Sequence, residues 1–221
     1  MSELRKIPLF PLNTVLFPGM MLPLHIFEER YKLMIYRCVT ENTPFGVVLI
    51  REGNEVGGGA KVYDIGTTAH ITKIDPLDDG RMNIATLGFH RFKIHEFVNE
   101  EPYLCGLIED FPLQEIDSPL AVKEASRLGP MLLKYLDIIT AISDVDVKLD
   151  KLPDDAMTMA FLTAIVLRAP MEDKQALLNI PSLPAMLRSE RKMLVREAQL
   201  MRFFLEHTPK WLDSPSPFSP N

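Results

Sequence analysis

The spacing of apolar residues changes near residue 115, and this change restricts the folds that the chain can adopt. Before it, apolar residues form short runs, as at 45–50 (FGVVLI), or alternate with polar ones, as at 68–72. Both patterns are typical of short β-strands. After Ser118-Pro119, which is a helix start signal, the apolar residues recur at helical spacing. The sequence therefore predicts an α+β chain with a β-rich pseudo-barrel at 1–115 and a helical bundle at 116–208.

The β-rich part is predicted to contain short strands and one helix. Asp78-Asp79-Gly80 is a hairpin signal, and the strand that follows it is expected at 81–87. Residues 52–60, with three consecutive glycines, are interpreted as a flexible connection, since no phosphate-binding motif surrounds them. Five apolar residues at i, i+3, i+4, i+7 and i+8 predict the helix. These residues are Tyr31, Met34, Ile35, Cys38 and Val39.

The helical part is predicted to contain several helices of different character. Pro130 is expected to kink or split the first helix. The segment 154–167 is apolar nearly all round and is therefore expected to be central and buried. Ser182 is expected to open a long last helix, with Glu190 on its solvent side. The tail 209–221 has four prolines and three serines and is expected to be flexible, with docking of a short peptide as the alternative.

Composition excludes several classes of protein. The 24 basic and 30 acidic residues give a net charge of −6, which argues against nucleic-acid binding. Arg91, Lys93 and His95 share a strand face that we interpret as solvated. Two cysteines without a CxxC pair favour a reducing compartment, and we expect a cytoplasmic protein. Residues 7–27 carry no charge, but four prolines argue against a membrane helix.

No catalytic, cofactor-binding or metal-binding residue is predicted. Cys38 and Cys105 lie in apolar surroundings, which make a thiol inert. No HExxH, GxSxG or SxxK motif occurs. The carboxylate pairs Asp78-Asp79 and Asp154-Asp155 are explained as a turn and a helix cap.

The segment 16–27 carries more apolar side chains than one face of a strand can bury. Five residues in and just after it are predicted to contact exposed or unfolded polypeptide. They are Phe17, Met20, Met21, Phe27 and Tyr31. The alternative is that the helical part covers them, and the two interpretations are weighted equally. A proline-flanked strand edge here is also a candidate for pairing with an extended peptide.

Residues 7–35 (IPLFPLNTVLFPGMMLPLHIFEERYKLMI) resemble the opening of the N-terminal substrate-binding domain of ATP-dependent Lon proteases. The shared features are proline-leucine steps, an aromatic-Pro-Gly turn and an acidic-basic helix start. They fall here at Pro8-Leu9, Pro11-Leu12, Phe17-Pro18-Gly19, Pro23-Leu24 and Glu28–Arg30. The resemblance continues at 63–67, 79–81, 88–92 and 174–178. The Arg-Leu pair of the family's last region is not evident at 186–188.

This resemblance implies a PUA-like pseudo-barrel followed by a helical bundle. It also implies a free-standing Lon N-terminal domain protein, because 221 residues leave no room for ATPase and protease domains. We therefore expect a non-enzymatic polypeptide-binding module whose partners are protein or peptide clients, with a Lon-type protease as a further candidate partner and no nucleic acid or membrane. The alternatives are a small-molecule binder or small enzyme with a pocket between the two parts and, last, an RNA binder.

Overall fold

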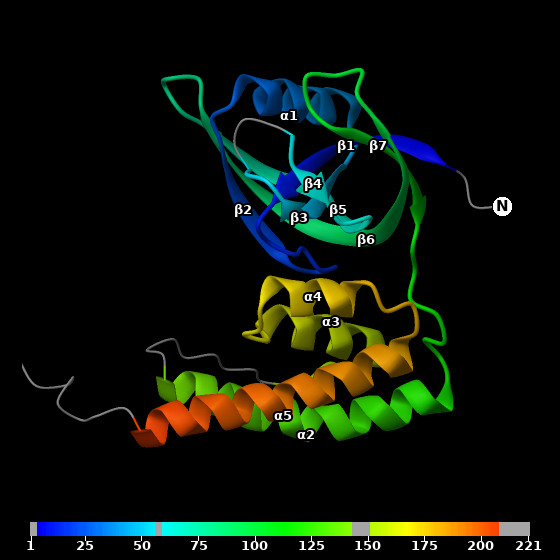
Figure 1. The fold of residues 1–221 in the computed structure, drawn as a ribbon, viewed down its shortest axis with the longest axis vertical. Coiled ribbons are helices and arrows are strands. Elements are labelled where there is room, and N and C mark those ends of the chain that lie inside the picture. The colour runs from blue at the N-terminus through cyan, green and yellow to red at the C-terminus, as the bar shows by residue number, and fades with distance from the viewer. Residues whose placement is uncertain (1–3, 56–58, 143–150, 208–221) are drawn as a thin grey trace, which may run out of the picture.

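The structure is a computed structural model that describes residues 4–55, 59–142 and 151–207. In Figure 1 a β-rich part lies above a layer of helices, and helix α1 covers the end of the β-rich part that faces away from that layer. The predicted α+β architecture is confirmed. The strands are β1 (Arg5–Leu12), β2 (Met21–Ile26), β3 (Phe45–Glu52), β4 (Lys61–Val62), β5 (Ile65–Pro76), β6 (Met82–Val98) and β7 (Cys105–Asp110). The helices are α1 (Glu29–Glu41), α2 (Pro119–Ile142), α3 (Ala156–Val166), α4 (Met171–Leu178) and α5 (Leu183–His207).

Five strands close on themselves. They are hydrogen-bonded in the order β1-β7-β6-β5-β3, and β3 pairs in parallel with β1. Two strands lie outside this ring, since β2 pairs with β6 and β4 pairs with β3. The predicted hairpin at 78–80 joins β5 to β6. The strand expected at 81–87 extends instead through 98. Register shifts bend it, so that this one strand pairs with β5 and with β7.

Helix α1 packs on one end of this ring. The helix buries Tyr31, Met34, Ile35 and Cys38, as its spacing predicts, whereas Val39 is exposed. The buried side chains join Phe10 and other strand residues in one apolar cluster. This packing closes one end of the β-rich part.

The helical part is built on two long helices, α2 and α5. Pro130 lies inside α2 without splitting it, and the side chain of Ser118 accepts a hydrogen bond from the Ala121 N–H (3.1 Å) at its start. Helix α3 is not buried all round as expected, because it packs on α2 and α5 from one side and its Met157 is exposed. None of the helices in the described ranges is long and apolar enough to cross a membrane.

The two parts share one apolar cluster. It contains Val15, Phe17 and Leu49 from the β-rich part and residues of all four helices below. The predicted boundary at 115/116 falls between β7 and α2, and the division into two folding units remains a prediction. The tail 209–221 lies outside the described residues.

Arg91 was expected on a solvated strand face, and that expectation is wrong. Its side chain is buried at the junction of the two parts, where Nη1 donates to the carbonyls of Leu178 (2.7 Å) and Ile180 (2.8 Å). Its Cζ lies 4.8 Å from the centre of the Phe111 ring. Burial lowers the pKa of Arg91 to about 10, so the guanidinium remains charged at neutral pH. Gln175 adds a second link by donating to the Ile65 carbonyl (2.9 Å).

The predicted position of Glu190 is also wrong. It was expected on the solvent side of α5, but the residue is 0% exposed. Neither carboxyl oxygen has a hydrogen-bond partner among the residues that the structure describes. Burial raises the pKa of Glu190 well above its ordinary value, which favours the neutral acid in the folded protein.

Candidate functional site

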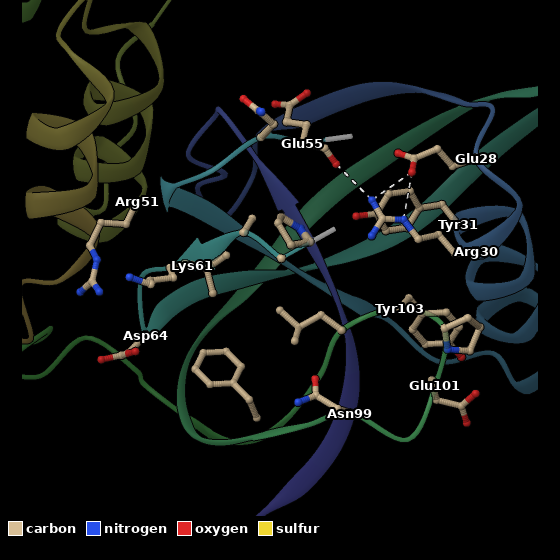
Figure 2. A pocket seen from close by; sticks show the side chains of 18 residues that line it. Glu28, Arg30, Tyr31, Arg51, Glu55, Lys61, Asp64, Asn99, Glu101 and Tyr103 are labelled. Carbon is tan, nitrogen blue, oxygen red and sulfur yellow. Dashed lines mark hydrogen bonds and ion pairs between the residues drawn. The ribbon is translucent and has the colours of Figure 1, made fainter. Parts of the chain in front are cut away.

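A cavity of about 820 Å³ opens on the side of the β-rich part, and we call it the barrel groove. Figure 2 shows its lining side chains, which come from β1, β3, β4, β6, the start of α1 and the loops β3–β4, β4–β5 and β6–β7. None of them comes from α2 to α5, so this cavity is not the pocket between the two parts that the alternative expected. Its size lies within the range of about 300–1,000 Å³ that is usual for ligand sites.

Apolar and aromatic side chains form much of the lining. Phe97 is 41% exposed there although it is a large aromatic residue. Tyr31 and Tyr103 also line the groove, and burial raises the pKa of both, so both phenols are neutral. Pro11 and Leu104 add further apolar surface.

Charged groups at one end of the groove neutralise one another. Arg30 Nε donates to the Glu28 carboxylate (3.0 Å), and its Nη2 donates to the Glu55 carbonyl (3.2 Å). The Arg30 Cζ also lies 4.4 Å from the centre of the Tyr31 ring. In Figure 2 these residues lie together, on the side of the groove away from Arg51.

The other end carries exposed charges of both signs. Lys61 Nζ lies 2.6 Å from a Glu52 carboxylate oxygen, whereas Arg51 Nε reaches that carboxylate only at 4.0 Å. Asp64 lies at the same end in Figure 2. Such a lining differs from the basic surface that binds phosphate backbones.

A smaller cavity of about 180 Å³ adjoins the barrel groove. The two share Glu28, Tyr31 and Glu55 in their linings. The smaller cavity adds Leu24 and Phe27, and Phe27 is 48% exposed. The barrel groove therefore continues toward the end of β2.

The five predicted contact residues fall in different places. Phe27 and Tyr31 line the smaller cavity, although Tyr31 is mostly buried. Phe17 is 0% exposed and lies in the cluster shared with the helices, so the helical part covers it. Met20 is half-buried and touches two clusters. Met21 is 59% exposed but lies on the outer side of the sheet, paired with Leu87 of β6.

Sequence reasoning missed Phe97 and the β6–β7 loop. The alternation of residues along β6 does not predict that Phe97 turns toward a cavity. A register shift between Ile94 and Glu96 interrupts that alternation just before Phe97. The signal available in the sequence was an aromatic residue between Glu96 and Val98.

The remaining candidate chemistry does not assemble into a site. Cys38 and Cys105 are free and buried, and burial raises the pKa of Cys38 to about 11. Asp155 caps α3 by accepting from the Thr158 N–H (2.8 Å), as predicted. In the part of the chain that the structure describes, no group of three or more His, Cys, Asp or Glu side chains is placed to hold a metal ion.

Comparison with known proteins gives one consistent result. Residues 6–196 match the family described as the ATP-dependent protease La (LON) substrate-binding domain. A Lon protease of Anaeromyxobacter dehalogenans is 27% identical over 199 residues, and Lon protease 2 of Myxococcus xanthus is 28% identical over 202. Each alignment covers 89% of this chain and 24% of the relative, so the chain spans about a quarter of those proteins.

Two solved structures share the fold. A Lon N-terminal domain protein from Xanthomonas campestris has a TM-score of 0.62 at 24% identity, with 83% of this chain and 95% of that chain covered. The N-terminal domain of the Mycobacterium avium complex Lon protease has a TM-score of 0.68 at 16% identity, with 86% and 98% covered. Together with the match over residues 6–196, these findings place the chain in the LON substrate-binding domain family.

Proposed function

We propose that this protein binds unfolded polypeptide in the barrel groove without catalysing a reaction on it. The observation that carries the proposal is an open groove that exposes two aromatic residues. Phe97 lines the barrel groove itself, and Phe27 lines the smaller cavity that adjoins it. Exposed aromatic side chains in a concave site offer apolar contact area to a segment that has no folded structure of its own. The family name, a substrate-binding domain of a protease, supports the same role.

The charges of the groove support weak and general binding. Arg51 and Lys61 lie at one end and Asp64 lies beside them, so neither sign of charge dominates. A segment is then held mainly by its apolar side chains and main chain, not by one charged group. Protein clients and a Lon-type protease are the partners that this role implies.

The test is a binding titration with a permanently unfolded probe. Fluorescein-labelled α-lactalbumin, reduced and carboxymethylated, is titrated with the protein and followed by anisotropy. We expect Phe27→Ser with Phe97→Ser to weaken binding about tenfold or more, since each exposed aromatic contact contributes on the order of 1 kcal/mol. Phe89→Ser is the matched control, because Phe89 is 51% exposed and lies outside the groove lining. Equal losses in both variants, or no binding of the probe by the wild type, would contradict the proposal.

The size of the cavity also favours a second candidate, a small-molecule ligand. A thermal shift screen with metabolites separates the two functions. A stabilising metabolite, together with no binding of the unfolded probe, would favour the second candidate.

A further inference from the structure

The barrel groove lies where two paired strands separate. Strands β5 and β6 pair up to Ile65 and Lys93, and the Ile94 N–H then donates to the Asp64 carbonyl (2.7 Å). Beyond this point the two strands separate. The residues before β5 belong to β4, which pairs with β3, whereas β6 continues along β7. Val62 of β4 and Phe97 of β6 both line the groove. The groove therefore occupies a gap in the sheet between two strands.

Strand β4 presents an unused main-chain edge. The Tyr63 N–H donates to the Leu49 carbonyl (3.0 Å), so Tyr63 turns its main-chain groups toward β3. Because these groups alternate along an antiparallel strand, the N–H and C=O of Val62 point away from β3. Among the residues that the structure describes, neither group takes part in a main-chain hydrogen bond outside the strand ladders.

An unpaired edge of this kind is costly unless water or another strand satisfies it. Val62 is only 6% exposed, and its side chain belongs to an apolar cluster of the barrel. Buried main-chain donors and acceptors are almost always paired. Edge strands with free N–H and C=O groups are templates for the addition of a further strand.

The second free strand edge is less suitable. The carbonyl of Met20 accepts from the Gly88 N–H (2.9 Å), so the same alternation directs Met21, Pro23 and His25 away from β6. Proline has no N–H, and Pro23 therefore removes the central donor from that edge. The edge of β2, which the sequence suggested as a pairing site, therefore lacks a central donor. The edge of β4 keeps its donor at Val62.

We propose that an extended segment of client polypeptide enters the barrel groove as an added strand and pairs its main chain with Val62. This inference rests on the proposed function and specifies how the segment is held. Alternate side chains of the segment then meet the apolar lining, including Phe97 and Leu104. Main-chain pairing does not depend on side-chain identity, so the site accepts unrelated unfolded segments and discriminates against proline-rich ones.

The first test uses a soluble peptide with the core Thr-Val-Phe-Val-Thr between Gly-Ser flanks. Its analogue with every core amide N-methylated keeps the side chains but cannot donate main-chain hydrogen bonds. We expect the analogue to bind the wild-type protein at least about tenfold more weakly, since each net hydrogen bond corresponds to a factor of about two to ten. Equal affinities would overturn the inference.

The second test is made on Val62 itself. Val62→Pro removes the N–H, and Val62→Ala keeps it while shortening the same side chain. We expect binding of the peptide to be weakened further by the proline variant than by the alanine variant. If the proline variant does not fold, hydrogen exchange of the Val62 amide in the wild-type protein tests the inference instead. The Tyr63 amide, which already donates to Leu49, is the internal reference.

The outcomes separate the inference from the function on which it rests. Slower exchange at the Val62 amide in the saturated complex, by about tenfold or more, supports the added strand. Saturating binding with unchanged exchange at Val62 overturns the added strand and leaves polypeptide binding intact. Failure of both the peptide and the carboxymethylated α-lactalbumin to bind overturns both.

Discussion

The end of the β-rich part that faces helices α2 to α5 is filled, whereas one side of the β-rich part is open. At the filled end Phe17 lies in the cluster shared with the helices, and Arg91 of β6 donates to the carbonyl of Leu178 at the end of α4 and to that of Ile180 just after it. At the open side Phe27 and Phe97 stay exposed around the barrel groove. Phe17 and Phe27 belong to the same apolar segment of the sequence, so composition does not separate them. The two residues differ because the helical part covers Phe17 and leaves Phe27 uncovered. The uncovered side is therefore the one available to a partner.

The largest effect is expected from opening the filled end. Phe17→Ala removes a fully buried ring, and such changes cost about 3–5 kcal/mol of folding free energy. Phe27→Ala is the control on the open side, with an expected change of about 0.5 kcal/mol or less. Urea denaturation of both variants measures the difference. Similar losses would mean that the two residues are not in different environments.

Arg91→Met tests the polar link across the same end. The change keeps an unbranched apolar stem but leaves the Leu178 and Ile180 carbonyls without their donor, at an expected cost of about 2 kcal/mol. Lys93→Met, on the same strand but exposed, is expected to be nearly neutral. Faster amide exchange in α4 of the Arg91 variant is the specific sign that the junction has loosened. Unchanged stability would show that the link contributes little.

Glu190→Gln tests the buried acid of α5 through its pH dependence. Because burial raises the pKa of Glu190 in the folded state, the folded protein binds more protons than the unfolded chain between the two pKa values. Wild-type stability then falls as the pH rises through this window, by up to about 1.4 kcal/mol per pH unit. The variant lacks this loss, so its advantage in Tm should grow from pH 4 upward. A constant difference would contradict the assignment, and Glu172→Gln, on the exposed side of α4, is the control.

Met21→Ser is expected to have the smallest effect. Met21 is 59% exposed on the outer sheet face and outside the groove lining, so stability should change by about 0.5 kcal/mol or less. Binding of carboxymethylated α-lactalbumin should be unchanged. A clear loss of affinity would move the contact surface from the barrel groove to the face formed with Leu87.

Local features of the fold were predictable because their causes lie within a few residues. The turn at 78–80, the buried face of α1 and the Ser118 cap all follow from neighbouring residues. Arg91 and Glu190 were misplaced because remote elements bury them, and the first bond partner of Arg91 lies 87 residues away. The barrel groove depends on where β5 and β6 separate, which no local pattern encodes. Two of the five predicted contact residues, Phe27 and Tyr31, nevertheless line its smaller cavity.

The most direct test of the open side is NMR chemical-shift mapping with the carboxymethylated α-lactalbumin probe. The proposal predicts that shifts concentrate at the amides of Phe27, Val62, Phe97 and Tyr103, with little change near Phe17 and Arg91. Shifts confined to Met21, Leu87 and Phe89 on the outer sheet face, or no shifts at saturating probe, would contradict it.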